Sequence, residues 1–469
     1  MLLADVIGSD APAVDVTALA YDNRVVTPGT LFFCVPGFTR DGHDFADDAI
    51  ARGAVALVVQ RPLDLGVPEI LVDDVRAAMA PAAAALAGDP TARLTTVGIT
   101  GTNGKTTTAF LVRALLEAGG RSTGLLGTVT AVVGGEEHAV ARTTPEAIDL
   151  QRTFADMLAA GDEAVVMEVS SHALALHRAD AIHWSAAVFT NLTQDHLDFH
   201  ADMEDYFLAK RRLFEAGPEV AVIDVDDPYG ARLAADLPDA VRIGLDAPDA
   251  QVRARVVGAD ASGSRFAVGE LELRTALPGR FNVRNALAAV VVARELGVDD
   301  ATIAAALPRA GRVPGRFEPV EEGQPFAVIV DYSHTPDSLE NALRAAREIA
   351  DGRVIAVFGA GGDRDRAKRP LMGAAAAGGA DVAIITSDNP RNEDPEAIIA
   401  AVAEGAPEAE RVVDRRAAIE RAVALARPGD VVVVAGKGHE QGQEFEGGRK
   451  VPFDDVTVAR EALRARVVA

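Results

Sequence analysis

A glycine-rich stretch between an apolar run and a helical pattern is the part of the chain best suited to chemistry. Within residues 94–110, glycines recur at positions 98, 101 and 104, and Lys105 and Thr106 follow directly. Backbone N–H groups at a helix N-terminus bind anions, and glycine lets the backbone approach them closely. We therefore predict that this stretch cradles a nucleotide phosphate, with Lys105 on the outer phosphates and Thr106 on Mg²⁺.

The spacing of this loop departs from the usual phosphate-binding pattern. That pattern places a glycine five positions before the Gly-Lys pair, where this chain has Ile99. The alternative is a glycine turn before an ordinary helix. Apolar residues at helical spacing follow the loop and end at Gly119 and Gly120, which supports the order strand, loop and helix.

Two later strand patterns end in polar side chains. Residues 164–168 form an apolar run that ends in Glu168, and residues 187–196 end in His196. Ligands bind at the carboxyl ends of strands in open α/β sheets, so we expect Glu168 to bind a metal near Thr106. His196 is a candidate second ligand, although a lone histidine is more often structural. Lys210 follows in a helical pattern, where a lysine ordinarily faces solvent or phosphate.

Glycine loops flank an apolar strand near the start of the chain, within residues 22–43. Arg24, Arg40 and His43 lie in these loops and could bind an anionic group such as a diphosphate. Ordinary surface turns explain the spacing equally well.

Composition excludes several classes of protein. The chain has 469 residues, enough for about three domains, and a formal net charge of −24, which argues against general binding to nucleic acids or anionic membranes. One cysteine, Cys34, excludes an internal disulfide and a Cys-pair zinc site. No run of about 18 apolar residues is present, and Met1–Asp5 lacks a basic region, so we expect a cytoplasmic protein without a signal peptide.

Strand and helix patterns alternate from residue 327 onward, as in a doubly wound parallel sheet. Polar clusters follow three of these strands, and all three should open on one edge of the sheet: residues 359–366, 387–391 and 436–440. The first cluster resembles a dinucleotide loop, but Arg364 replaces its last glycine, so a nicotinamide site is disfavoured. Residues 240–275 read as short antiparallel strands, and Asn282 and Asn285 as caps of the next helix.

The expected elements in the two outer parts of the chain can be stated by residue. Buried strands are predicted at 55–59, 69–72, 327–330, 354–358, 382–386 and 431–435. Helices are predicted at 77–86, ending near Gly88, and from near residues 337, 367, 395 and 417.

At this point the chain resembles the Mur ligases, which build the peptide stem of bacterial peptidoglycan. The resemblance covers essentially the whole length and rests on an ordered set of motifs: residues 98–107, 143–146, 167–174, 189–198, 206 with 210, 281–285, 331–336, 388–391 and 436–440. It implies an α/β protein of three domains: a UDP-sugar-binding domain over residues 1–93, a P-loop ATPase-like domain over 94–313, and a Rossmann-like doubly wound amino-acid-binding domain over 314–469.

The resemblance also implies an activity. The chain would use ATP to add meso-2,6-diaminopimelate to UDP-N-acetylmuramoyl-L-alanyl-D-glutamate through an acyl phosphate, as a monomer in peptidoglycan synthesis, which supports cell shape and division. The alternatives are the lysine-adding Mur ligase, a folylpolyglutamate-synthase-like ligase, a P-loop kinase or NTPase, and a nucleotide-bound scaffold. A scaffold has no need for Lys105, Glu168, His196 and Lys210 together.

Site residues follow from the motifs that match. ATP contacts are implied at Gly101, Thr102, Asn103, Gly104, Lys105, Thr106, Thr107, Asn285, Arg316, Asp331 and His334. Two Mg²⁺ ions are implied at Thr106, Glu168, His196 and a carbamylated Lys210. The UDP-sugar dipeptide would contact Asn23, Thr143, Thr144, Ser170 and Arg178. Diaminopimelate would contact Arg364, Asp388, Asn389, Pro390, Arg391, Gly436 and Glu440.

Two residues depart from the family pattern. Asn23 stands where the family usually has Ser in an Asp-Ser-Arg uridine motif, and Leu176 stands where some members have a substrate-holding Gln. Both departures concern the UDP-dipeptide site and leave the expected ATP site unaffected.

Overall fold

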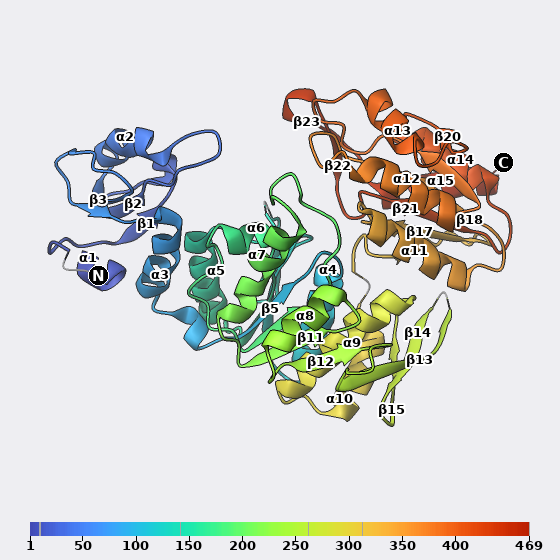
Figure 1. Ribbon diagram of the computed structural model, residues 1–469, viewed down its shortest axis with the longest axis horizontal. Coiled ribbons are helices and arrows are strands. Elements are labelled where there is room, and N and C mark those ends of the chain that lie inside the picture. Colours follow the sequence, from blue (N-terminus) through green and yellow to red (C-terminus); the bar gives the residue numbers. More distant parts are fainter. Residues whose placement is uncertain (9–10, 141, 261, 312, 469) are drawn as a thin grey trace. The chain divides into compact units, whose positions relative to one another are not determined.

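The computed structural model describes residues 1–8, 11–140, 142–260, 262–311 and 313–468 (Figure 1). The chain divides into two compact units. The first unit comprises Met1–Thr100, Gly120–Val188 and Ala209–Ala221, and the second comprises Gly101–Gly119, Phe189–Leu208 and Val222–Ala469.

The first unit begins with a four-stranded parallel sheet in the order β1-β2-β3-β4. Its strands are β1 Ala18–Ala20, β2 Thr30–Phe33, β3 Ala54–Val59 and β4 Glu69–Leu71, and its helices are α1 Leu3–Ile7, α2 Ala46–Ala51 and α3 Val75–Ala87. The predicted strand at 55–59 and the helix end at Gly88, whose φ is +76°, are confirmed. The prediction that 69–72 is buried is wrong, because β4 is a half-exposed edge strand.

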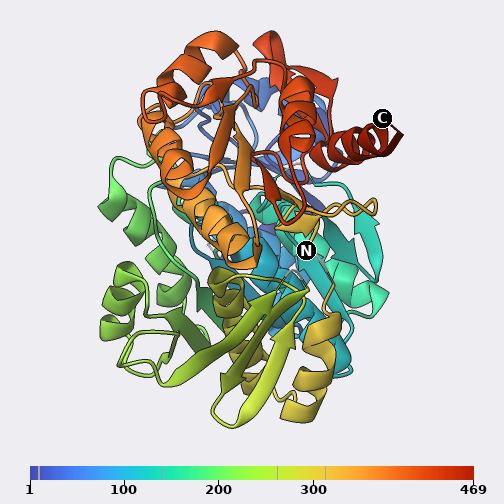
Figure 2. The same ribbon diagram turned by 90° about the vertical axis from the view of Figure 1, so that its right-hand side faces the viewer.

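The largest sheet has eleven strands in the order β15-β14-β13-β12-β11-β10-β5-β9-β6-β7-β8. Its strands are β5 Thr95–Thr100, β6 Thr123–Leu126, β7 Ala131–Val133, β8 Glu136–His138, β9 Ala164–Glu168, β10 Ala186–Phe189, β11 Val220–Asp224, β12 Val241–Gly244, β13 Val252–Asp260, β14 Gly263–Val268 and β15 Leu271–Thr275. As predicted, β13, β14 and β15 pair antiparallel, and Figure 2 shows them side by side in yellow-green. The prediction is wrong for β12, also within residues 240–275, which pairs parallel with β11 and β13.

The helices between these strands and after them are α4 Lys105–Ala118, α5 Ala147–Ala160, α6 Ser171–Ala175, α7 Met203–Glu215, α8 Pro228–Asp236, α9 Arg280–Glu295 and α10 Asp300–Ala306. Short 3₁₀ turns occur at Asn23–Val25, Gly42–Phe45, Pro90–Ala92, Leu307–Arg309 and Glu446–Gly448. The order strand β5, glycine loop and helix α4 confirms the prediction from the glycine spacing.

The C-terminal part of the second unit is a six-stranded sheet in the order β16-β17-β21-β18-β19-β20. Its strands are β16 Glu318–Pro319, β17 Ala327–Asp331, β18 Val354–Phe358, β19 Val382–Ile385, β20 Glu410–Arg411 and β21 Val431–Ala435, followed by the hairpin β22 Gly442–Phe445 and β23 Arg449–Pro452. Its helices are α11 Pro336–Ile349, α12 Lys368–Gly379, α13 Pro395–Ala403, α14 Arg415–Leu425 and α15 Asp455–Val468. Within the six-stranded sheet, neighbouring strands are parallel except for β16 and β17.

Strand β21 shows how this sheet forms two cores. Val431, Val433 and Ala435 pack with residues of α11, α12 and α13, whereas Val432 and Val434 pack with residues of α14 and α15. Because side chains alternate between the two faces of a strand, a wholly apolar run is buried on both faces. The predicted doubly wound sheet is therefore confirmed.

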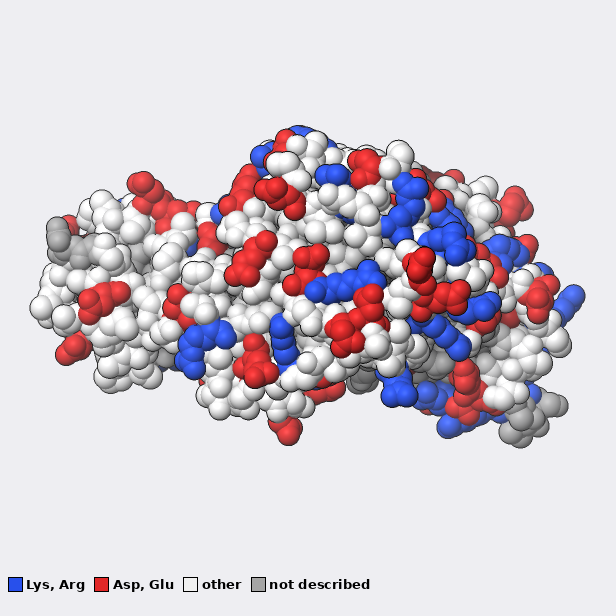
Figure 3. Space-filling view, turned by 90° about the horizontal axis from the view of Figure 1, so that it is seen from below, with Lys and Arg blue, Asp and Glu red and all other residues white. Residues whose placement is uncertain are grey.

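The surface carries both signs of charge. Figure 3 shows Lys and Arg interspersed with Asp and Glu over the visible face, in a chain whose formal net charge is −24. Among the residues that the structure describes, no helix is both long enough and apolar enough to cross a bilayer.

Candidate active site

The phosphate loop joins β5 to α4 in a conformation that requires glycine. Gly101 and Gly104 have φ of +145° and +85°, and an added Cβ would clash with Thr190 Oγ1 and with Asn285 Oδ1, respectively. Lys105 Nζ donates to the carbonyl oxygens of Gly101 and Thr102 at 2.9 and 2.8 Å, so its ammonium group lies over the loop. This is where a cation meets the phosphates that a helix N-terminus binds.

Side chains from two other segments hold the loop in place. The Asn103 amide N–H donates to Asn191 Oδ1 at 2.9 Å, and Thr190 Oγ1 donates to the Asn103 carbonyl oxygen at 2.7 Å. Asn103 Nδ2 donates to Asp337 Oδ2 at 2.9 Å, which ties the loop to α11. The loop is therefore fixed in advance of ligand binding, which lowers the cost of ordering it.

Arg316 reaches the first turn of α4 from the linker before β16. Its Nη2 donates to Thr106 Oγ1 at 2.9 Å, and its guanidinium lies 4.3 Å from the centroid of the Tyr332 ring. Asn285 also faces this helix and accepts from Thr108 Oγ1 at 3.4 Å. The structure thus brings Arg316 and Asn285, two of the predicted nucleotide contacts, to the first turn of α4. A capping role for Asn285 is wrong, because Gly279 is the N-cap of α9.

Asp331 and His334 follow β17 and shape the turn there. Asp331 Oδ2 accepts from the Phe317 amide at 2.7 Å, and Oδ1 accepts from the Ser333 amide at 2.9 Å. His334 Nδ1 lies 2.8 Å from the Tyr332 carbonyl oxygen, to which it donates. Asp331 therefore fixes the backbone next to Arg316 with both of its oxygens.

Asp195 is a buried carboxylate that the sequence interpretation missed. His334 Nε2 lies 3.7 Å and His196 Nε2 3.4 Å from its Oδ2, and Lys368 Nζ lies 3.8 Å from Oδ1. Burial acts to raise the pKa of Asp195, but the hydrogen bond from His334 and the charges of His196, His334 and Lys368 hold that pKa well below its ordinary value. Its position directly before His196 was the available signal. His196 itself has a φ of +56° and a side chain that is 40% exposed.

In the first unit, Glu168 lies at the end of β9 within a cluster of hydroxyls. Its Oε1 accepts from the Thr128 amide at 2.7 Å, and Thr128 Oγ1 lies 3.0 Å from Thr143 Oγ1. Thr144 Oγ1 donates to the Glu168 carbonyl oxygen at 2.9 Å and accepts from the Ser170 amide at 3.2 Å. The predicted residues Thr143, Thr144, Ser170 and Glu168 therefore lie together.

Arg178, near the same cluster, pairs with Glu146, an acidic residue that was not among the predicted site residues. Its Nη2 lies 2.9 Å from Glu146 Oε1, which also pairs with Arg142 Nη1 at 2.8 Å. Arg76 of α3 pairs with Glu146 Oε2 at 3.3 Å. Three guanidinium groups thus share one carboxylate, which leaves excess positive charge suited to an anionic substrate.

Lys210 lies on α7 with only 1% of its surface exposed. The ordinary interpretation of a solvent-facing lysine is therefore wrong, since a buried amine must be paired or chemically altered. Across the described ranges, no group of three or more His, Cys, Asp and Glu side chains is arranged to hold a metal ion.

The loops after β18, β19 and β21 form the predicted polar edge of the C-terminal sheet. Arg391 has a φ of +51°, and its Nη1 donates to the Gly362 carbonyl oxygen at 2.7 Å while its Nε donates to Glu444 Oε2 at 3.1 Å. Glu444 is the ion-pair partner of Arg391, whereas the nearby Asp394 caps α13. A Cβ added to Gly361 would lie 3.1 Å from Arg391 Nη1 and 3.8 Å from Arg364 Cγ, so both arginines flank Gly361.

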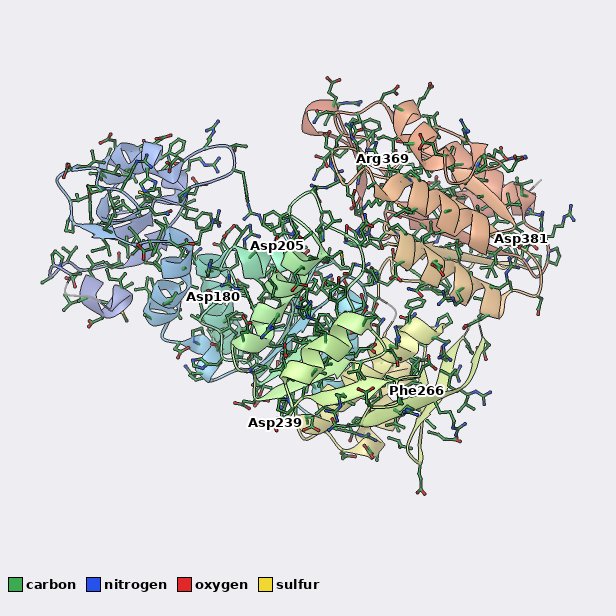
Figure 4. All side chains as sticks on the ribbon, viewed as in Figure 1. Asp180, Asp205, Asp239, Phe266, Arg369 and Asp381 are labelled. Carbon is green, nitrogen blue, oxygen red and sulfur yellow. The ribbon has the colours of Figure 1, made fainter. Side chains whose placement is uncertain are left out.

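Arg369 of α12, labelled in Figure 4, holds this loop from behind. Its Nη2 donates to Glu393 Oε1 at 2.8 Å and to the Gly361 carbonyl oxygen at 3.2 Å. The hydrogen bonds from Arg369 lower the pKa of Glu393 to about 2. Arg364 is 54% exposed, and its Nη1 lies 3.5 Å from Asp198 Oδ2.

The glycine loops near the start of the chain differ from the expected anion site. His43 is buried, its Nδ1 lies 2.6 Å from Asp41 Oδ1, and its Nε2 accepts from the Gln60 amide at 3.0 Å. Both ring nitrogens are thus engaged, so His43 shapes the loop and is not available to a diphosphate. Asn23 Nδ2 donates to Asp48 Oδ2 at 2.7 Å.

Comparisons with known proteins give a consistent result. Sequence models of three domains match the chain: the Mur ligase family catalytic domain over residues 15–88, the Mur ligase middle domain over 99–293 and the Mur ligase glutamate ligase domain over 315–438. The UDP-N-acetylmuramoyl-L-alanyl-D-glutamate–2,6-diaminopimelate ligase of Geobacillus thermodenitrificans is 48% identical over 96% of each chain. That of Streptomyces coelicolor is 47% identical over 98% of this chain and 96% of its own.

A solved structure with the same name is similar as well. It has a TM-score of 0.73 at 32% identity and covers 100% of this chain and 99% of its own.

Proposed function

This chain belongs to the Mur ligase family, and we infer that it is an ATP-dependent ligase that adds meso-2,6-diaminopimelate to UDP-N-acetylmuramoyl-L-alanyl-D-glutamate. The resemblance drawn from the motifs and the α/β fold class are both confirmed. The observation that carries the inference is the ordered phosphate loop, with Lys105 over it and Arg316 on Thr106, in a chain 48% identical to a relative named for this activity.

The reaction that we infer is amide formation driven by ATP. A substrate carboxylate attacks the γ-phosphate, which gives an acyl phosphate and ADP, and the amine of diaminopimelate then attacks the carbonyl carbon as phosphate leaves. Phosphoryl transfer depends on positioning and on neutralising charge. Lys105 and Arg316 supply positive charge at the loop, and the backbone N–H groups at the start of α4 bind phosphate oxygens.

Magnesium fits the residues that the resemblance assigns to it. Mg²⁺ prefers oxygen ligands and usually binds few protein groups besides substrate phosphates. Thr106 offers a hydroxyl, and Glu168 a buried carboxylate that Thr128 holds in orientation. The ion would neutralise charge on the phosphates. We propose that Thr106, Glu168, His196 and a carbamylated Lys210 serve the two ions.

Carbamylation of Lys210 has a direct test. This amine is buried, and a carbamate would convert it to a carboxylate-like ligand. We expect intact-protein mass spectrometry, on protein kept with bicarbonate and Mg²⁺, to show one added CO₂ that the Lys210→Ala variant lacks. That variant should lose about 10- to 100-fold in activity, with partial recovery in short carboxylates. The exposed Lys450→Ala is the matched control, and an unmodified amine at Lys210 would contradict the proposal.

The remaining assignments extend to the substrates and the domains. We propose that residues 1–93 bind the UDP-sugar, 94–313 bind ATP and 314–469 bind the amino acid. Asn23, Thr143, Thr144, Ser170 and Arg178 would contact the UDP-dipeptide, and the three arginines around Glu146 suit its anionic groups. The protein would act as a cytoplasmic monomer on small molecules, without nucleic acid or membrane partners.

Acceptor choice tests the function most sharply. Diaminopimelate differs from lysine by one carboxylate, which Arg can bind bidentately. Gly362 and Glu444 hold Arg391 in place, and the acceptor carboxylate would complete its contacts. We expect Arg391→Ala to lose about 30-fold or more in kcat/KM for diaminopimelate, with ATP binding unchanged.

The measurement is ADP release with the UDP-dipeptide and either diaminopimelate or lysine. Arg416→Ala, which breaks a surface pair with Glu461 in the same domain, is the control and should change little. If the wild type uses lysine as readily as diaminopimelate, the chain is a lysine-adding or other branch of the family. If Arg391→Ala treats both acceptors as the wild type does, Arg391 does not bind the acceptor.

A further inference from the structure

Lys437 is a fully buried lysine in the loop after β21, and the proposed reaction assigns it no role. Its side chain has 0% exposure. Its Nζ lies 2.9 Å from Asn389 Oδ1, 2.9 Å from Glu440 Oε2 and 3.5 Å from Asp388 Oδ1. An ammonium group has three N–H donors, and these three side chains are all proposed acceptor contacts. Lys437 is therefore buried next to the proposed diaminopimelate site and contacts three of its side chains.

The contacts of Lys437 fix the orientation of the Asn389 carboxamide. Its Oδ1 accepts from Lys437 Nζ and from the Glu444 amide at 3.0 Å, whereas its Nδ2 donates to Glu440 Oε2 at 2.8 Å. With two donors on its oxygen, the amide cannot be turned over without losing all three bonds. The second hydrogen on Asn389 Nδ2 therefore points in a fixed direction, in which it can donate to a ligand.

Charge in this cluster is unbalanced toward the negative. Asp388 and Glu440 are two carboxylates that share the single ammonium of Lys437. Arg415 also faces Asp388, but Asp455 pairs with Arg415 at 2.7 Å and neutralises it. One net negative charge therefore remains, which suits an incoming ammonium group.

The ionisation of Asp388 depends on the same neighbours. Burial acts to raise the pKa of Asp388, but Lys437, Arg415 and His334 hold that pKa below its ordinary value. Glu440 in turn faces Tyr332, whose hydroxyl lies 3.5 Å from Oε1. Glu444, the remaining carboxylate near this cluster, is paired with Arg391 at 3.1 Å. Lys437 is thus the cation that contacts both proposed carboxylates directly.

We propose that Lys437 is a positioning residue of the acceptor site, which holds Asp388, Asn389 and Glu440 in the orientation in which they receive the amino-acid end of diaminopimelate. The proposal rests on the proposed function, because that function places the acceptor at these three side chains. Lys437 acts through them and does not itself touch the reacting atoms.

The test replaces Lys437 with methionine, which is unbranched, one heavy atom shorter and uncharged. We expect Lys437→Met to raise KM for diaminopimelate by about 10-fold or more, with KM for ATP within about twofold of the wild type. Loss of the cation that lowers the pKa of Asp388 should raise that pKa, so the acid limb of kcat/KM for diaminopimelate should move to higher pH by about 1 unit. Lys450→Met, at an exposed position of β23, is the matched control and should change neither.

The outcomes separate this inference from the function beneath it. If the wild type releases no ADP with the UDP-dipeptide and diaminopimelate, the proposed function fails. The positioning role alone is overturned if the wild type is active and Lys437→Met has the wild-type KM for diaminopimelate and the wild-type pH profile. It is also overturned if Lys437→Met lowers kcat and leaves KM for diaminopimelate unchanged.

A second variant covers the case in which Lys437→Met does not fold. The pair K437M/E440Q removes one cation and one carboxylate, so the net charge of the cluster stays at −1. Compared with E440Q alone, it should still lose about 10-fold or more in kcat/KM for diaminopimelate, because Asp388 and Asn389 lose their contacts with Lys437. If the double variant matches E440Q alone, Lys437 does not position Asp388 and Asn389, and the proposal is overturned.

Discussion

Replacing Lys105 with alanine should slow ADP release by about 10²- to 10³-fold and leave the fold intact. The ammonium group lies over the phosphate loop, where it donates to the carbonyl oxygens of Gly101 and Thr102. In the proposed reaction it would turn to the phosphoryl group as negative charge develops there. Removing such a preorganised charge raises the barrier by roughly 3 to 4 kcal/mol, which is a loss of about 10²- to 10³-fold in kcat.

Stability should change little in this variant. Lys105 is partly exposed at the start of α4, and alanine has the highest helix propensity, so the melting temperature should stay within a few degrees. Arg113→Ala is the matched control, because Arg113 lies on the same helix and pairs with Glu117 across one turn at 2.7 Å. Near-normal ADP release by folded Lys105→Ala protein would refute the assignment of this loop to phosphate.

The sequence predicted the buried parallel strands well and the edges poorly. Strands β18 and β21 begin and end at the predicted residues, since strands covered on both faces are written as continuous apolar runs. Strand β4 was wrongly expected to be buried, because Ile70, Leu71 and Val72 form a short apolar run that resembles a core strand. The hairpin β22–β23 and helix α15 were not predicted at all, since their polar and apolar residues are mixed without a clear period.

The candidate site divides in a similar way. Motifs close in sequence, such as the glycine loop at residues 101–106, identify the side chains that meet there. Partners distant in sequence could not be found: Arg391 pairs with Glu444, 53 residues away, and Lys437 with Asp388, 49 residues away. The prediction that His43 could bind a diphosphate is wrong for the same reason. The Gln60 amide donates to its Nε2, and no local sequence pattern indicates this contact. Only the fold brings these groups together.

The ion pair of Arg415 and Asp455 should be the most costly contact to break in the C-terminal sheet. Both side chains have 0% exposure, and Arg415 Nε and Nη2 donate to the two carboxylate oxygens at 2.8 and 2.7 Å. The pair joins α14 to the first residue of α15. Asp455→Ala leaves a buried, uncompensated guanidinium group, which typically destabilises a protein by about 3–5 kcal/mol.

Urea unfolding followed by circular dichroism measures this loss, with Glu461→Ala as the control. Glu461 pairs with Arg416 at 2.5 Å, but the two side chains are 53% and 46% exposed, and such surface pairs contribute about 0–1 kcal/mol. Equal, small losses in both variants would contradict the prediction.

A second variant separates the penalty of an unpaired buried charge from the stabilisation that the pair itself provides. Arg415 Nη1 is buried without a hydrogen-bond partner among the described residues, so the pair is incompletely satisfied. The double change R415M/D455L, which removes both charges, should therefore be less destabilising than Asp455→Ala alone.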